Sequence, residues 1–168
     1  MSLVIENGSL VANAVTYASV DDLRAFAAAR KSTLPSDDDS LEAALIVAMD
    51  FIEGFRTDFK GLKVDPLNQP LQWPRTGVLI DGAKFPATSI PKELIAAQCQ
   101  LAIECAAGVD LMPTGDGRGI VREKIDIIET EYAPNNGGAP QPIFVKAKAF
   151  LDPLLNSGGT GRLNVTRG

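Results

Sequence analysis

The chain has 168 residues, the length of one ordinary domain and enough to bury roughly 70% of its unfolded surface in a single core. Hydrophobic residues make up 45% and charged residues 22%, and sixteen Lys and Arg against twenty-one Asp and Glu leave a net charge of −5. Histidine is absent, which excludes imidazole-based nucleophilic catalysis and zinc sites with histidine ligands, while the acidity argues against a general nucleic-acid coat.

The first 16 residues mix β-branched residues with Asn and Gly without a clear period. This predicts an irregular N-terminal arm with at most a short strand, of the kind that often lies on a neighbouring molecule. The arm has no basic region and no long apolar run, so we expect no secretory signal. Ser19 and Asp22 then suit a capping pair, and the apolar stripe that follows predicts a first helix ending near Lys31.

The clearest helical pattern begins after Asp37, Asp38 and Asp39, three acids that suit the positive end of a helix dipole. Apolar residues recur at steps of three and four from Leu41 to Phe59, which predicts a core-facing second helix of about five turns. Because the acids are consecutive and no spaced calcium loop follows, helix capping explains them better than metal binding.

A proline-rich segment over residues 61–91 contains five prolines and three glycines and predicts a long loop, which is usually functional or ordered by a partner. Between Phe55 and Arg75, cations alternate with aromatic rings and give a local charge of +2, which suits single-stranded nucleic acid. The alternative is that the rings belong to the core. The candidate contacts are Arg56, Lys60, Lys63, Trp73 and Arg75.

A third helix is predicted from about residue 90 to residue 107, and its only charged residue after Leu94 is Glu104. A helix that is apolar nearly all round needs cover on several faces, so it is either a central core helix or part of a subunit interface. Cys99 and Cys105 are six residues apart on this helix and face different ways, so we expect two free thiols in a reducing compartment.

The remaining third of the chain alternates between glycine-rich and regular segments. Residues 114–119 predict a flexible loop that lacks the features of a phosphate-binding motif. Residues 121–132 predict one long strand or a tight hairpin, and residues 143–155 predict a last helix. No apolar stretch approaches the ~20 residues that cross a bilayer, so we expect no membrane partner.

These elements predict a mainly α fold, a small helical bundle of about four helices. A short β-segment or hairpin at about 120–133, a long proline-rich loop, and extended N- and C-terminal arms complete it. We expect a single domain over residues 1–155, with the arm at 1–16, and a flexible tail over residues 156–168. Since no motif supports catalysis, we expect no enzymatic activity, no catalytic or metal residue and no cofactor.

The order of several motifs resembles a tailed-bacteriophage family. Its members are often labelled DnaT-like single-stranded-DNA-binding proteins and look like head–tail connectors, or head-completion adaptors. The likeness covers nearly the whole chain, and its most specific element is the block from Gln72 to Arg75. Lys31 departs from the family's pattern, in which a glycine often stands there, and Asp126-Ile127 replaces a Gly-Pro pair. The other matching stretches are residues 17–20, 41–55, 71–78, 90–94, 121–125, 128–133 and 162–168.

The resemblance implies a mostly helical virion protein that forms a ring of about twelve copies beneath the portal. Such a ring completes the head and docks the tail while the double-stranded genome passes through it, and acidic walls suit that passage. The implied partners are further copies of this chain, the portal protein and a tail or head-closure protein, with assembly in the host cytoplasm. The expected interface residues are Arg122, Lys124, Ile128, Tyr132, Arg162 and Arg167.

A second hypothesis comes from a different class of function. The patch around Trp73 predicts a replication-associated protein that binds single-stranded DNA, with bases stacking on the ring while Arg and Lys hold phosphates. The sequence alone leaves both hypotheses open.

Overall fold

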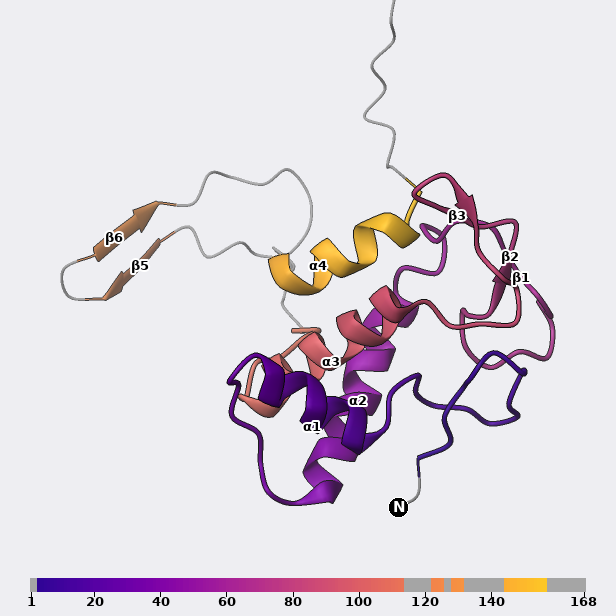
Figure 1. The fold of residues 1–168 in the computed structure, drawn as a ribbon. Coiled ribbons are helices and arrows are strands. Elements are labelled where there is room, and N and C mark those ends of the chain that lie inside the picture. The colour runs from indigo at the N-terminus through magenta and orange to yellow at the C-terminus, as the bar shows by residue number, and fades with distance from the viewer. Residues whose placement is uncertain (1–2, 114–121, 126–127, 132–143, 157–168) are drawn as a thin grey trace, which may run out of the picture.

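Four helices form the body of the molecule. The computed structural model describes residues 3–113, 122–125, 128–131 and 144–156 (Figure 1). The prediction of a mainly α fold with about four helices is confirmed, and a short 3₁₀ helix follows the last of them. We call residues 3–113 and 144–156 the helical body. Its helices are α1 (Val20–Ala29), α2 (Asp38–Glu53), α3 (Lys92–Ala106), α4 (Val145–Leu151) and the 3₁₀ helix η1 (Asp152–Leu154).

The strands of the described residues form three small antiparallel pairs. Two pairs lie in the proline-rich segment, which therefore contains short regular elements as well as turns. The third pair is the hairpin, in which Ile125 lies opposite Ile128 across residues 126–127, so the tight-hairpin alternative is confirmed. The pairs are β1 (Leu62–Lys63) with β2 (Arg75–Thr76), β3 (Leu79–Ile80) with β4 (Ala83–Lys84), and β5 (Arg122–Ile125) with β6 (Ile128–Glu131).

The first two helices begin where the capping residues predict. The Ser19 hydroxyl accepts a hydrogen bond from the Asp22 N–H while the Asp22 carboxylate accepts one from the Ser19 N–H, a complete capping box. Asp37 caps α2 by accepting a hydrogen bond from the Ser40 N–H, and this hydrogen bonding lowers the pKa of Asp37. Both helix starts are therefore fixed by local sequence.

The second and last helices are shorter than predicted. α2 ends at Glu53 with Gly54 as its C-cap, and the chain then reaches buried Phe59 through turns. Phe59 still lies in the core, since the apolar spacing reflects burial rather than helix length. α4 ends at Leu151 because Pro153 cannot supply the backbone N–H that another α-helical turn requires.

The third helix is the centre of the bundle. α3 packs against α1, α2 and α4, and its buried residues lie on several faces (Figure 1). Buried Gln98 joins three parts of the chain: its Nε2 donates to Leu45 O and Thr16 Oγ1, and its Oε1 accepts from the Tyr17 N–H. The core alternative for the apolar surface of α3 is therefore confirmed.

The N-terminal arm packs on its own chain rather than standing free. Ile5 forms a parallel bridge with Thr16, and the buried carboxylate of Glu6 accepts hydrogen bonds from the N–H groups of Gly8, Leu10 and Val11. Residues 3–18 therefore pack on their own chain through these contacts, and contact of the arm with a neighbouring molecule stays a prediction.

Both cysteines are free thiols, as predicted. Burial raises the pKa of Cys99 to about 12 and also raises the pKa of half-buried Cys105. None of the described helices is long and apolar enough to cross a membrane. No cluster of metal-binding side chains occurs among the described residues.

We expect Cys99 to resist alkylation in the folded protein. At pH 8 a pKa of about 12 leaves a thiolate fraction about a thousandfold below that of a thiol with an ordinary pKa, and the side chain is also covered. Iodoacetamide labelling followed by fragment-ion mass spectrometry should show Cys105 modified first in native protein. The two thiols should react alike in guanidinium chloride. Equal rates in the native protein would contradict the burial of Cys99.

Candidate nucleic-acid interface

The tryptophan of the predicted DNA patch lies in the core. Its side chain is 0% exposed and packs edge-on against Phe59 and Phe85, with ring centroids 6.1 and 5.9 Å away. The backbone N–H of Trp73 donates to the Tyr17 hydroxyl at 2.8 Å, and burial raises the pKa of that phenol. No base can stack on an indole in this position, so the core alternative describes Trp73 correctly.

Arg75 uses its guanidinium to brace the backbone. Its Nε and Nη2 donate at 2.8 Å to the carbonyl groups of Lys60 and Gly61, and weaker bonds reach Phe59 O and the Gln72 side chain. Only 6% of the residue is exposed, and burial lowers the pKa of the guanidinium. The N–H donors of the guanidinium bind main-chain carbonyl oxygens, so Arg75 is not available to bind a phosphate.

The three remaining candidates of this patch differ from one another. The Lys60 ammonium donates to Pro153 O at 2.8 Å and to Leu79 O at 3.4 Å, while the Lys63 ammonium donates to Gln69 O at 2.8 Å. Burial lowers the pKa of Lys63. Arg56 is exposed to solvent. Lys60 and Lys63 therefore make structural contacts with backbone carbonyl groups, as Arg75 does, while Arg56 is the exposed cation of the predicted patch.

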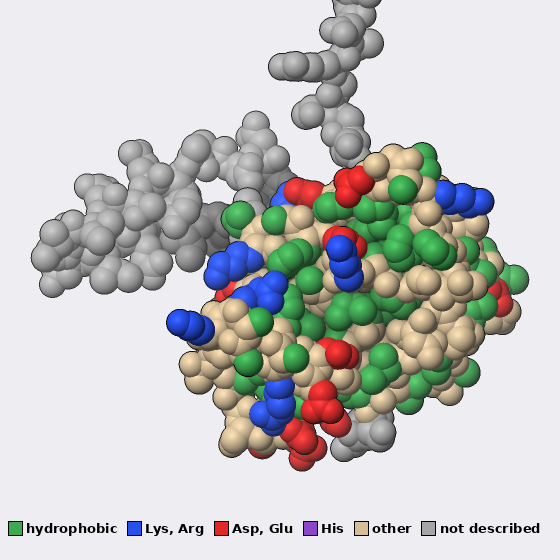
Figure 2. Space-filling view, in the orientation of Figure 1, with side chains coloured by type: hydrophobic (Ala, Val, Ile, Leu, Met, Phe, Trp, Pro, Cys, Tyr) green, Lys and Arg blue, Asp and Glu red, His purple; other side chains and the backbone are tan. Residues whose placement is uncertain are grey.

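A different part of the surface combines cations with an aromatic ring. A hollow of about 410 Å³ lies where α3 and α4 meet the residues that follow α1. Figure 2 shows several Lys and Arg side chains gathered on the side where α1 ends and α4 begins. We call this hollow the basic groove; it is lined by Arg30, Ser32, Gln100, Lys146, Ala149 and Phe150.

Arg30 is the best-placed cation of the basic groove. Its guanidinium carbon lies 3.5 Å from the ring centroid of Phe26 and 5.9 Å from that of Phe150, and its Nη1 donates to Phe26 O at 3.2 Å. Cation–π contact with two rings holds the guanidinium in place and leaves other donors for a ligand. Lys31 and Lys146 are both exposed, and among the described residues neither they nor Arg30 form a salt bridge.

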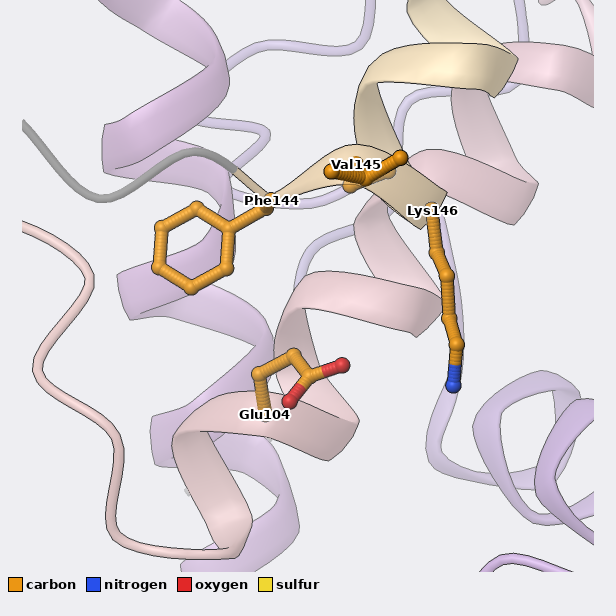
Figure 3. Close-up of a pocket in the computed structure, with 5 residues that line it drawn as sticks. Glu104, Phe144, Val145 and Lys146 are labelled. Atoms are coloured by element: carbon orange, nitrogen blue, oxygen red, sulfur yellow. The ribbon is translucent and has the colours of Figure 1, made fainter. Parts of the chain in front are cut away.

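The start of α4 borders a second, smaller hollow of about 270 Å³. Figure 3 shows Phe144 and Val145 at the start of α4 above Glu104 of α3, while the Lys146 side chain extends away from Phe144. Glu104 accepts a hydrogen bond at 2.9 Å from Nε2 of Gln100. Glu104 and Lys146 line this smaller hollow together, so the acid lies near one cation of the basic groove, and Gln100 lines the basic groove while bonding to Glu104.

The basic groove stands out against the charge of the whole body. The helical body carries eleven Lys and Arg against sixteen Asp and Glu, so its own net charge is −5. A strand of phosphates is repelled over most of such a surface and attracted where cations gather. No sequence window reveals this site, because its residues come from three segments far apart in the chain.

For the candidate interface residues of the hairpin, the structure gives the strand pairing alone. Arg122 lies opposite Glu131 and Lys124 lies opposite Glu129, and Ile128 begins the second strand. Figure 1 shows β5 and β6 standing away from the four helices. Tyr132, Arg162 and Arg167 lie outside the described residues.

A family model described as "Putative DnaT-like ssDNA binding protein" matches the chain over residues 1–168. Neither the curated proteins nor the solved structures contain a match.

Proposed function

Since the chain belongs along its whole length to this DnaT-like family, we propose that it binds single-stranded DNA and that the basic groove holds the strand. The observation that carries the proposal is the juxtaposition of Arg30, Lys146 and Phe150 in one hollow of an otherwise acidic body. Single-stranded sites combine phosphate-binding cations with faces on which bases stack.

Each groove residue has a distinct role in this proposal. Lys146 neutralises a phosphate, and so does Lys31, an exposed cation outside the groove lining that follows Arg30 in the chain. Arg30 offers both charge and a flat guanidinium that its two phenylalanine neighbours hold in place. Phe150 adds an aromatic face to the lining, and Ser32 and Gln100 add polar atoms. Such a site contacts the phosphate backbone of the DNA and the flat faces of its bases, which all four bases have. We therefore expect little preference for DNA sequence.

Three cations predict a shallow but measurable salt dependence. Displacing counterions from three phosphates of a single strand gives a slope of about −2 in a plot of log affinity against log salt. Raising salt fourfold should then weaken binding about twentyfold. Fluorescence anisotropy of a labelled oligothymidylate of about 16 nucleotides measures this slope and does not depend on the buried Trp73.

Variants of the groove test its location. We expect Arg30→Ala and Lys146→Ala each to weaken binding several-fold and to reduce the slope by about 0.7. The matched controls are Arg56→Ala and Lys84→Ala, which remove exposed cations outside the groove. If all four variants weaken binding equally, the strand does not use the groove, and the absence of binding at low salt would refute the function.

We also propose a second function, a head–tail connector or adaptor that forms a ring of about twelve copies beneath a phage portal. One observation favours it: the β5–β6 hairpin stands away from the body and pairs with itself (Figure 1). A lone two-stranded hairpin is marginally stable in water, so it gains stability when a partner covers it. Neighbouring copies, the portal protein and a tail or head-closure protein are the proposed partners.

The adaptor proposal predicts an assembly that depends on the hairpin. Mass photometry should detect a complex of about twelve copies when the protein is mixed with portal protein. Replacing residues 122–131 by a short glycine linker should abolish that complex while leaving the melting temperature of the body nearly unchanged, because the hairpin lies apart from the helices. Deleting residues 157–168 should weaken docking without unfolding the body. Monomers at every concentration, with and without portal protein, would contradict the proposal.

A further inference from the structure

The smaller hollow at the start of α4 differs in chemistry from the basic groove. It combines the carboxylate of Glu104 and the ammonium of Lys146 with the apolar side chains of Phe144, Val145 and Ala147. We call this the Glu104 hollow. Its volume of about 270 Å³ lies just below the range of pockets for drug-sized molecules, which suits a single ring system.

The apolar side of the Glu104 hollow is built on a fixed ring. Phe144 packs edge-on against Phe51 of α2, with ring centroids 5.3 Å apart and an interplanar angle of 89°. Val145 beside it is 72% exposed. Figure 3 shows both side chains above Glu104. A flat ring in this hollow therefore has apolar contacts for its faces and a carboxylate for its edge.

The Glu104 carboxylate selects the group that can lie beside it. Its Oε1 accepts a hydrogen bond from Nε2 of Gln100 at 2.9 Å, and it forms no salt bridge with another described residue. An ionised carboxylate accepts hydrogen bonds at about four sites and donates none. It therefore repels a phosphate and suits the N–H donors on the edge of a base.

Guanine is the base that best matches a carboxylate. Its N1–H and its 2-amino group point the same way and reach both carboxylate oxygens at once. Adenine and cytosine offer one amino group each, and thymine offers a single N–H. Because paired hydrogen bonds to an ion are stronger and more selective than single ones, the hollow favours guanine.

The Glu104 hollow continues the basic groove. Lys146 lines both, and Gln100 lines the groove while bonding to Glu104. Gln100 and Glu104 lie four residues apart on α3, a rise of about 6 Å, which is similar to the spacing of neighbouring nucleotides in an extended strand. A strand held at Lys146 can therefore place a phosphate in the groove and the adjacent base in the hollow.

We propose that the Glu104 hollow binds one guanine of a single DNA strand, with the N1–H and 2-amino group of the base donating to Glu104. This inference rests on the proposed binding of the strand by the basic groove. The groove contacts features that all four bases share, and the hollow adds a preference at one position.

A series of oligonucleotides tests the preference without changing the protein. Fluorescence anisotropy should show that one central guanine in an oligothymidylate of about 16 nucleotides tightens binding about five- to tenfold, since the strand can slide to place it in the hollow. Hypoxanthine lacks the 2-amino group and should lose most of this gain. Adenine at the same position should give less than a twofold gain.

A variant of the carboxylate locates the preference. Glu104→Gln replaces one acceptor oxygen by an NH₂ donor, which opposes the donors of guanine, so the gain from guanine should disappear. The variant should bind plain oligothymidylate slightly more tightly, because a negative charge near Lys146 is lost. The matched control is Glu93→Gln, which removes the same charge from α3 outside both hollows and should keep the full preference.

The outcomes separate this inference from the proposed function. If oligothymidylate binds but guanine adds nothing, or if Glu104→Gln keeps the preference, the hollow is not a guanine site while strand binding by the groove stands. If no oligonucleotide binds at low salt, the proposed function and this inference fall together.

Discussion

The Trp73→Ala variant should lose about 3–5 kcal/mol of unfolding free energy, the cost of truncating a large buried aromatic side chain. The indole is fully covered between Phe59 and Phe85. Its Nε1 has no hydrogen-bond partner among the described residues, so apolar packing is what the substitution removes. Urea unfolding monitored by circular dichroism measures the loss.

A Trp73→Phe variant controls for ring packing in this prediction. It keeps an aromatic ring between the two neighbours and removes the unpartnered N–H, so we expect it to lose less than half as much free energy. A Trp73→Ala protein with unchanged urea midpoint that no longer binds DNA would contradict burial of the indole. The measurement therefore separates a structural role from a contact role.

The Gly61→Ala variant should be destabilised by about 2–4 kcal/mol, through backbone strain and a steric clash together. Gly61 has φ +68°, and a Cβ there would lie 2.3 Å from Thr76 O and 2.8 Å from Val78 Cγ2. The Gly61 carbonyl also accepts a hydrogen bond from Arg75, so a shift of this backbone weakens that hydrogen bond.

Gly77→Ala is the matched control for the glycine prediction. Gly77 has a similar φ of +74°, but a Cβ there would meet nothing within 4 Å, so only the conformational cost of about 1 kcal/mol is expected. Chemical denaturation measures the unfolding free energy of both variants, and the difference between their losses gives the cost of the steric clash at Gly61. Equal losses at the two positions would show that the contact with Thr76 relaxes freely.

The starts of the first two helices could be predicted from local sequence, because they depend on nearby side chains, whereas α3 and α4 begin without a side-chain cap. Ser19, Asp22 and Asp37 act within four residues of their targets, and the apolar stripe of α2 packs on α3. The end of α2 could not be placed, since Phe59 continues the apolar spacing while the backbone has left the helix. Beyond Glu53, a buried turn and a continued helix would show the same spacing of apolar residues in the sequence.

The candidate site was harder to predict because one sequence pattern serves two purposes. Cations among aromatic rings are typical of strand binding, and they also describe a buried ring whose neighbouring arginine binds carbonyl groups, as Trp73 and Arg75 do. The pairing of Arg75 with Lys60 O and Gly61 O depends on tertiary structure. The basic groove joins Arg30 to Lys146 across more than a hundred residues, so no local pattern reveals it.

The order of the helices separates α4 from α3 by a long stretch of chain, although the two pack directly on each other. The hairpin is inserted between them and stands away from both (Figure 1). Lengthening such an insertion costs little, since doubling a closed loop adds only about 0.6 kcal/mol of entropy. The hairpin can therefore be lengthened or shortened at little cost to the packing of α4 on α3.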